Sequence, residues 1–478
     1  MSPSTPSPAP TSPTPPPEHP AVAALAGQLE GSVLLPGEPG WDDARAAWNL
    51  AIDQHPAAVV RARSPRDIRR VILAARESGL GVSTQPRGHG AGSDLSDCIL
   101  VRTAAFDEIT VNEAGRYARV GAGVPWGALL SRLDGTGLIA LAGSNPDVSV
   151  AGYLLSGGHS WFSRWKGLAA HSVRAVELID AQGVLRRVTA ESDPDLLWAV
   201  RGAGGLFGVV TALEIDLFGA ADLFGGKLLF PAESAEVVFG AAIDVLMDAP
   251  PELSLFLGLI NMPDLPVVPE LLRGRTFTQV DAVYVGSVAD GEALLAPLLT
   301  IAPVIANLTR PFSIGQLGEV SAEPQEPSFT LDWSMAVGDL DSATIAGLVG
   351  AFHTASYAGL TVLQLRPLGG IQVDPTHGAG GLAGHLDPGL LLFAGAILPP
   401  GGEAPTEADA RLAFQPLENT VQGIRSAKSV ASLLSAGDEL DDAYPPAALE
   451  RLAGIKRNVD PENLFRSNHP LPARFQGR

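Results

Sequence analysis

Apolar and polar positions change their spacing several times after Ala57, and each change predicts a new element. The stretch 57–84 starts with a short apolar run, continues with a helical pattern and ends in a second apolar run. One face of the helical part collects Ile68, Val71, Ile72 and Ala75. This stretch therefore predicts a strand, a helix and a strand.

The ends of this predicted helix are marked by residue type. Ser64 is a suitable N-cap, Pro65 fits the first helical position, and Asp67 closes a pair that resembles a capping box. Gly79 can adopt the left-handed conformation that ends a helix. We therefore expect the helix to span the residues between Ser64 and Gly79.

The chain up to Phe218 continues with short strands and glycine-containing connections. The patterns predict a strand at 117–120, a turn and a helix within 121–138, a hairpin over 173–190 and a strand within 207–218. The hairpin turn falls at 180–183. We interpret residues 22–218 as one compact α+β domain.

The pattern changes after Gly219. Helical periodicity at 234–249 and 342–355 alternates with strand patterns at 278–286 and 360–370. Residues 219–430 therefore predict a second α+β domain, an antiparallel sheet with helices. A last helix and a turn rich in Pro and Asn follow within 431–478, which we treat as a separate C-terminal segment.

Composition adds limits to this picture. The chain has 478 residues, more than one ordinary core needs. Residues 1–21 are rich in Pro, Ser and Thr and predict a disordered tail, not a secretory signal. No apolar run is long enough to span a bilayer, so we expect a cytoplasmic protein without a membrane partner.

Charge and cysteine content exclude further classes. The net charge of −20 argues against nucleic acid, whose phosphates are held by Lys and Arg. Cys98 is the only cysteine, so neither an intrachain disulfide nor a cysteine-based metal site can form, and we expect a buried structural thiol. No His or carboxylate cluster has metal-ligand spacing, and we predict no metal.

Four glycine-containing loops in the first domain carry the candidate chemistry, at 86–94, 121–127, 143–160 and 201–210. Neither the Gly-x-Gly-x-x-Gly pattern of a dinucleotide fold nor a P-loop is present. Four such loops in one domain suit a long cofactor with a pyrophosphate and a flat ring, because glycine lets the backbone approach a ligand closely.

The loops resemble a known family. "PRGHG", the stretch from "GSNPDVSVAGYLLSGGHS" onward, "DPDLLWAVRGAGGLFGVVTALE" and the terminal "DPENLFRSNHP" are similar to the berberine-bridge-enzyme-like FAD-linked oxidases of the vanillyl-alcohol-oxidase/PCMH superfamily. The resemblance is dense over 56–218 and 444–470 and looser between them. It implies a PCMH-type FAD-binding domain, a substrate domain and a C-terminal segment that returns to the FAD domain.

The resemblance also assigns a role to His89. In the family this His is bonded through a ring nitrogen to the 8α-methyl carbon of the flavin. Relatives with a second covalent bond carry Cys where this chain has Asn145, so a single histidyl linkage is expected. Many relatives have Arg four residues before the His, where this chain has Gln85; Arg87 stands two before, and which of them faces FAD stays open.

Further FAD contacts follow from the matching positions in the four loops and the C-terminal turn. They are Arg87, Gly88, His89, Gly90, Ala91, Gly92, Ser93, Ser144, Asn145, Val148, Ser149, Gly152, Tyr153, Ser156, Gly157, Gly158, His159, Trp161, Gly204, Gly205, Gly208, Val210 and Asn468. Val148 stands at the position that controls oxygen access, and its small side chain favours an oxidase.

The catalytic base is the point where the chain departs from the family. Many bacterial relatives carry a Tyr-x-Asn motif before the terminal helix, but small or aliphatic residues stand at 431–435 here. The candidates that remain are Arg366, Gln364, His385, Asp332, Asp281, His353 and His377. We rank Arg366, Gln364 and His385 first.

These observations predict an FAD-dependent oxidase that passes hydride from a hydroxyl-bearing small molecule to flavin and electrons to O2. Two alternatives stay open: a flavin dehydrogenase with another acceptor, and a flavoprotein that binds or cyclises its substrate without net redox chemistry. A sugar, another alcohol or a secondary metabolite would each fit as the substrate.

Overall fold

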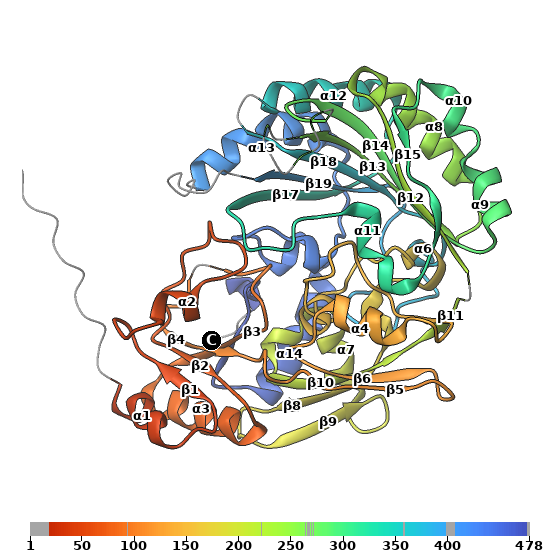
Figure 1. The fold of residues 1–478 in the computed structure, drawn as a ribbon. Helices are drawn as coiled ribbons and strands as arrows, with labels where there is room; N and C mark the ends of the chain where they lie inside the picture. Colours follow the sequence, from red (N-terminus) through yellow and green to blue (C-terminus); the bar gives the residue numbers. More distant parts are fainter. Residues whose placement is uncertain are drawn as a thin grey trace, which may run out of the picture.

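The computed structural model describes residues 19–92, 94–220, 222–262, 264, 268, 270, 272–356, 359–397 and 407–475. Residues 1–18 of the predicted disordered tail lie outside this part. The first described helix, α1 (Pro20–Ala23), begins slightly ahead of the expected start at Val22. Two bodies lie one above the other, a lower one with two sheets and an upper one with a single large sheet (Figure 1).

The first sheet of the lower body is mostly parallel. Its order is β1-β2-β4-β3-β20, and only β1 runs antiparallel to its neighbour. The strands are β1 (Ser32–Leu34), β2 (Ala58–Arg61), β3 (Gly81–Gln85), β4 (Cys98–Arg102) and β20 (Phe465–Arg466). Cys98 is buried in this sheet, as expected. The carboxyl ends of β2, β4 and β3 therefore share one edge.

Helix α3 (Pro65–Ser78) connects β2 to β3 as the apolar pattern predicts. Ser64 caps it by accepting a hydrogen bond from Asp67 N, and Gly79 ends it with a φ of 68°. The predicted role of Asp67 as a capping-box partner is wrong. Its buried carboxylate accepts from the backbone N–H of Glu30, Gly31 and Arg63 and so fixes the chain before β1.

The second sheet of the lower body is antiparallel, in the order β5-β6-β10-β8-β9. Its strands are β5 (Ile109–Asn112), β6 (Tyr117–Gly121), β8 (Val173–Ile179), β9 (Leu185–Thr189) and β10 (Val209–Asp216). The predicted hairpin is confirmed, because Gly183 N donates to Asp180 O between β8 and β9.

Short helices and the largest apolar cluster of the lower body lie with the antiparallel sheet. The helices are α4 (Trp126–Leu133), α5 (Val150–Leu155), α6 (Ser163–Lys166) and α7 (Pro194–Ala203), whereas α2 (Trp41–Arg45) packs on the parallel sheet. A small two-stranded sheet pairs β7 (Leu138–Ile139) with β11 (Phe218–Gly219). Trp126, Phe162 and Phe207 are almost fully buried in the cluster.

The upper body is one eight-stranded sheet in which all pairings are antiparallel. The strands are β12 (Leu223–Pro231), β13 (Leu253–Asn261), β14 (Thr276–Val285), β15 (Ala306–Asn307), β16 (Arg310–Phe312), β17 (Thr330–Val337), β18 (Val362–Pro367) and β19 (Leu390–Ile397). The central order is β12-β14-β13-β18-β19-β17. The expected α+β fold is confirmed.

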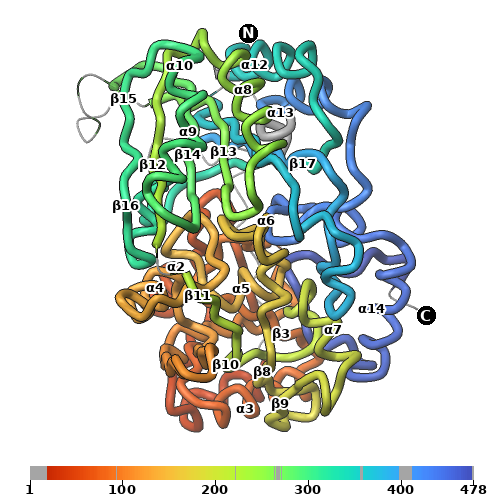
Figure 2. Tube along the Cα trace, turned by 90° about the vertical axis from the view of Figure 1, so that its right-hand side faces the viewer, coloured from red at the N-terminus to blue at the C-terminus, as the bar shows by residue number. Residues whose placement is uncertain are grey.

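Most of the described helices of this body cover the outer face of the sheet. Figures 1 and 2 place α8 (Ala235–Asp248), α10 (Leu298–Ile301), α12 (Ser342–Ser356) and α13 (Glu407–Val421) on the side away from the lower body. Apolar side chains fill the space between helices and sheet. The inner face, which carries polar residues, is turned to the lower body; α9 (Val288–Leu295) and α11 (Gly318–Ser321) complete this part.

The C-terminal segment joins the lower body. Helix α14 (Pro446–Val459) packs on α7, and β20 adds a parallel strand beside β3. Lys456 Nζ and Asp460 form a buried ion pair; Lys456 also donates to Leu206 O at 2.7 Å, and Asp460 accepts from Phe465 N at 2.9 Å. These contacts fix the turn that carries Asn468.

Candidate functional site

A narrow cavity opens between the ends of β3 and β4, helix α5, the loop after α7 and the C-terminal turn. Its lining is mostly glycine, alanine, serine and threonine, without an acidic side chain. The predicted residues that it brings together are Gly152, Ser156, Gly204, Gly205, Gly208, Val210 and Asn468. We call it the glycine-lined cavity.

Several lining residues were not predicted from the sequence. They are Thr84, Pro86, Thr103, Ala122, Ala151, Leu155, Gly202, Ala203, Ala431, Leu440, Ser467 and His469. Strand ends such as Thr84 and Thr103 become neighbours only through the pairing of β3 with β4. The approach of parallel strands at their carboxyl ends is the signal that could have identified them.

Glycine is required at two positions beside this cavity because of close contacts. A Cβ at Gly208 would lie 2.7 Å from Ile179 O. At Gly158, which has a φ of 68°, it would lie 2.5 Å from the Tyr153 ring. The backbone can therefore approach a ligand here only without a side chain.

The loop after β3 is fixed from both sides. Asn468 Nδ2 donates to Gly90 O, and Gln54 Nε2 donates to Gly92 O at 2.6 Å. Ala91 is buried, Gly88 has a φ of 91°, and Ser93 lies outside the described residues. The C-terminal turn and the predicted FAD loop are thus in direct contact.

His89 stacks on Trp48, with ring centroids 4.4 Å apart and an interplanar angle of 17°. Both ring nitrogens are buried, and neither has a hydrogen-bond partner among the described residues. Burial, and then the charge of Arg87, lowers the pKa of His89 to about 4. The imidazole is therefore neutral at pH 7 and has lone-pair density free for bonding.

Charged groups next to His89 are already paired. Arg87 Nη1 contacts Asp147 Oδ1 at 2.6 Å, and Asp147 Oδ2 lies 3.9 Å from His89 Nε2. Gln85 Oε1 accepts from Arg102 Nη1 at 2.9 Å. Gln85 and Arg87 are the two residues of which one was expected to face FAD. Each already has a partner in the protein, Arg102 for Gln85 and Asp147 for Arg87.

In the segment after β7, several residues predicted to contact FAD form hydrogen bonds with other parts of the protein. Asn145 Nδ2 donates to Pro324 O at 2.9 Å, and Ser149 Oγ caps α5 by accepting from Gly152 N at 3.1 Å. Ser144 is buried, and Val148 is half-buried against the apolar cluster of the lower body. Asn145 therefore links the two bodies.

Three further predicted residues lie at the contact with the upper sheet. Tyr153 Oη, His159 Nδ1 and Trp161 Nε1 are buried without a hydrogen-bond partner. Trp161 stacks on Phe256 of β13 at 3.7 Å. Burial, and then Arg366, lowers the pKa of His159 to about 3, so this imidazole is neutral.

Cross-strand pairing brings polar side chains together on the inner face of the upper sheet. Arg366 Nε donates to Gln364 Oε1 at 2.7 Å, and its guanidinium lies 4.5 Å from the Phe256 ring centroid. On neighbouring strands, Lys227 Nζ contacts Asp281 Oδ1 at 2.6 Å. Of the sequence candidates, Arg366, Gln364 and Asp281 thus lie on one surface.

Asp332 lies on the same face, at the strand that meets residues 431–435. Ser334 donates to Leu433 O, and Ser435 donates to Asp332 O at 3.1 Å. Burial, and then Asp438, raises the pKa of the Asp332 carboxyl to about 6. A half-buried carboxyl therefore lies where the chain lacks the family Tyr-x-Asn motif.

The other catalytic candidates lie elsewhere. His385 Nε2 is 3.0 Å from Lys428 Nζ, and no recorded contact in the described part of the chain joins it to Arg366 or Gln364. His353 is exposed on α12, on the outer side of the sheet, and His377 is exposed beside Asp374. His353 and His377 are therefore exposed and not part of the polar inner face.

The residues present fit FAD. The unpaired buried nitrogens of His89 and the unpaired atoms of Tyr153, His159 and Trp161 are the kind of groups that a ligand satisfies. The glycine-lined cavity offers backbone N–H groups and little side-chain bulk to a pyrophosphate. Pro86 lines this cavity, and His89 follows it three residues later in the same loop.

The described residues also bear on a metal site and on a membrane-spanning helix. Across the described ranges, His, Cys, Asp and Glu form no group of three or more that could hold a metal ion. Among the helices described, none is both long and apolar enough to cross a membrane.

Comparison with known proteins agrees with this geometry. Residues 56–189 match the family model described as "FAD binding domain", and residues 441–472 match "Berberine and berberine like". (R)-6-hydroxynicotine oxidase of Paenarthrobacter nicotinovorans is 26% identical over 467 residues, 93% of this chain and 97% of that protein. FAD-dependent monooxygenase tpcD of Cochliobolus heterostrophus is 33% identical over 211 residues, 43% of this chain and 41% of that protein.

Solved structures show the same fold over nearly the whole chain. 6-Hydroxy-D-nicotine oxidase from Arthrobacter nicotinovorans superposes with a TM-score of 0.79 at 23% identity, covering 93% of this chain and 98% of the other. Berberine bridge enzyme from Eschscholzia californica gives a TM-score of 0.79 at 16% identity, with coverages of 95% and 99%.

Proposed function

Because the chain belongs to the berberine-bridge-enzyme-like FAD-linked oxidoreductases, we propose that it is an oxidase that binds FAD covalently through His89 alone. It would oxidise a hydroxyl-bearing small molecule and reduce O2 to hydrogen peroxide. The related oxidases that cover most of this chain support the reaction class.

The environment of His89 is the observation that carries this proposal. The imidazole is neutral, stacked on Trp48 and unpaired at both nitrogens, in a loop whose Pro86 lines the glycine-lined cavity. A neutral nitrogen has the lone pair that a bond to the flavin methyl carbon requires. Asn145 is hydrogen-bonded to Pro324 and cannot supply a second thioether link.

The polar inner face of the upper sheet would receive the substrate. Arg366 is a permanently charged donor, held in place by Gln364 and by the Phe256 ring, and would orient a substrate oxygen. Asp332 is a half-buried carboxyl that would accept the hydroxyl proton above its pKa of about 6.

The bound flavin would supply the chemistry that these side chains lack, since it takes up hydride and passes electrons to oxygen. The small side chain of Val148 would leave the flavin open to O2. A cytoplasmic location, expected from the sequence, belongs to the same proposal.

The reaction is tested with the purified protein and a panel of sugars, benzylic alcohols and secondary-metabolite alcohols. We expect a yellow protein that one substrate class bleaches without air, and that consumes O2 and releases hydrogen peroxide when air is admitted. Reoxidation by a dye but not by O2 would identify a dehydrogenase. A colourless protein, or a turned-over substrate with no bleaching, would contradict the redox function.

A further inference from the structure

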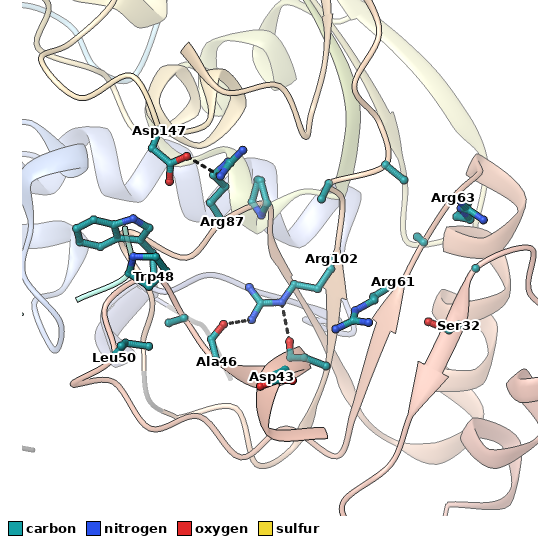
Figure 3. A pocket seen from close by; sticks show the side chains of 18 of the residues that line it. Ser32, Asp43, Ala46, Trp48, Leu50, Arg61, Arg63, Arg87, Arg102 and Asp147 are labelled. Atoms are coloured by element: carbon teal, nitrogen blue, oxygen red, sulfur yellow. Dashed lines mark hydrogen bonds and ion pairs between the residues drawn. The ribbon is translucent and has the colours of Figure 1, made fainter. Parts of the chain in front are cut away.

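A second and larger cavity lies at the β1 and β2 side of the parallel sheet and shares Pro86 with the glycine-lined cavity. It has a volume of about 930 Å3 and lies between the segment 43–50 and the carboxyl ends of β2, β4 and β3. Figure 3 shows Arg61, Arg63 and Arg102 directed toward this space, with Trp48 and Leu50 at its other end. We call it the arginine cavity.

Two of its arginines are direct neighbours in the sheet. Arg61 of β2 pairs in register with Arg102 of β4, and Ser32 and Gln85 continue the same row on either side. Like charges on directly opposite positions destabilise a sheet unless something compensates them. A bound anion would offset this repulsion.

No carboxylate of the described residues offsets it through an ion pair. Arg102 donates only to neutral oxygens, Ala44 O at 3.0 Å, Ala46 O at 2.6 Å and Gln85 Oε1 at 2.9 Å. Glu30, Asp43, Asp147 and Glu326 line the cavity, but none of them forms an ion pair with Arg61 or Arg102 in the described part of the chain, and Asp147 is paired with Arg87. Burial, and then Arg61, lowers the pKa of Arg102 to about 10.

This arrangement is unusual for the chain as a whole. The net charge is −20, and other sheet arginines such as Arg119 and Arg187 contact Glu177 and Glu214. The cavity also lies at the carboxyl ends of parallel strands, where open α/β sheets bind ligands.

We propose that the arginine cavity binds a small molecule through an oxyanion, a carboxylate or a phosphate, held by the guanidinium groups of Arg61 and Arg102. Guanidinium forms paired, charge-assisted hydrogen bonds with both kinds of oxyanion. The Arg63 side chain, which forms no ion pair among the described residues, adds charge at the rim, and Trp48 and Leu50 offer apolar surface to the rest of the ligand. The proposal does not depend on the oxidase reaction.

The test uses the purified, flavin-loaded protein. Inorganic phosphate and benzoate are titrated separately by calorimetry and by thermal unfolding, with NaCl at equal ionic strength as reference. We expect one of them to raise Tm by about 2 °C or more at saturation, and Arg61→Gln to weaken its binding about tenfold. Which of the two ligands binds identifies phosphate or carboxylate as the recognised group.

Matched variants separate this site from its surroundings. Arg132→Gln removes an exposed arginine of α4 and should bind as the wild type does. Arg61→Glu should raise Tm in the absence of ligand, because it faces Arg102, and should abolish the response to the anion.

Three results would overturn the proposal. The first is that neither anion stabilises the protein more than NaCl does. The second is that Arg61→Gln binds the anion as tightly as the wild type, and the third is that Arg61→Gln loses its flavin. The last result would assign the cavity to FAD.

Discussion

The carboxyl of Asp332 illustrates how burial sets chemistry at the level of one residue. It lies on the inner face of the upper sheet, and burial with the nearby Asp438 raises its pKa to about 6. At neutral pH the folded protein therefore holds a carboxylate that is less stable than the same group in the unfolded chain. The group can accept a proton near neutral pH, but its ionisation lowers the free energy of unfolding.

Asp332→Asn should consequently stabilise the protein in a pH-dependent way. The folded carboxyl binds its proton more tightly than the unfolded one, so the wild type loses stability as the pH rises from the unfolded pKa, about 4, to about 6. The Tm of Asp332→Asn minus that of the wild type should grow between pH 4 and pH 7 and then stay constant.

Asp341→Asn provides the control of opposite sign. Hydrogen bonds from Thr344 lower the pKa of the exposed Asp341, so this variant should lose stability relative to the wild type as the pH rises from acid values. A Tm difference for Asp332→Asn that is the same at pH 4 and pH 7 would show that the fold does not raise the pKa of this carboxyl.

At the scale of the element, short segments hold the site where two elements approach closely. The connection after α5 passes the Tyr153 ring so closely that Gly158 leaves no room for a side chain. Its φ of 68° is also strained for any other residue. The path of this backbone determines where Tyr153 and His159 lie.

Gly158→Ala should destabilise the protein by about 2 kcal/mol or more, from the left-handed conformation and the contact with Tyr153. Gly240→Ala is the matched control, because its Cβ would meet nothing within 4 Å in the middle of α8. It should stabilise α8 by about 0.5–1 kcal/mol. Thermal unfolding of both variants measures the difference; equal Tm values would contradict the account of this connection.

The same scale shows what the sequence could predict. Ser64, Pro65 and Gly79 defined α3 because capping depends on neighbours in sequence. Asp67 was misplaced because its partners, Glu30 and Gly31, come from a distant segment. The stacking of Trp48 on His89 was not predicted for the same reason. The two residues are 41 positions apart in the sequence, and only the fold brings their side chains together.

At the scale of the whole molecule, three distant segments meet around His89. Asn49 pairs with Ser328, its Oδ1 accepts from Thr330 N at 3.2 Å, and Asn145 donates to Pro324 O. The upper body is thereby joined to the loops of the lower body next to the proposed site of FAD attachment. The sequence predicted both bodies, but not this junction, because it depends on how they are stacked.

Asn49→Ala should weaken the junction. The buried side chain also accepts from Ala51 N, so its loss leaves two backbone N–H groups without their acceptor and should cost about 1–3 kcal/mol. Asn307→Ala, which removes bonds only within an exposed turn, is the control and should change Tm less. A Tm for Asn49→Ala at or above that of Asn307→Ala would contradict the role of the junction.

The central claim is that His89 holds FAD covalently, and flavin fluorescence of the protein band after denaturing electrophoresis tests it most directly. We predict a fluorescent band for the wild type and for the control His55→Ala, whose ring is exposed beside Asp53. We predict a dark band for His89→Ala, with intact folding shown by its thermal unfolding. A fluorescent His89→Ala band, or a dark wild-type band from a yellow protein, would contradict the account.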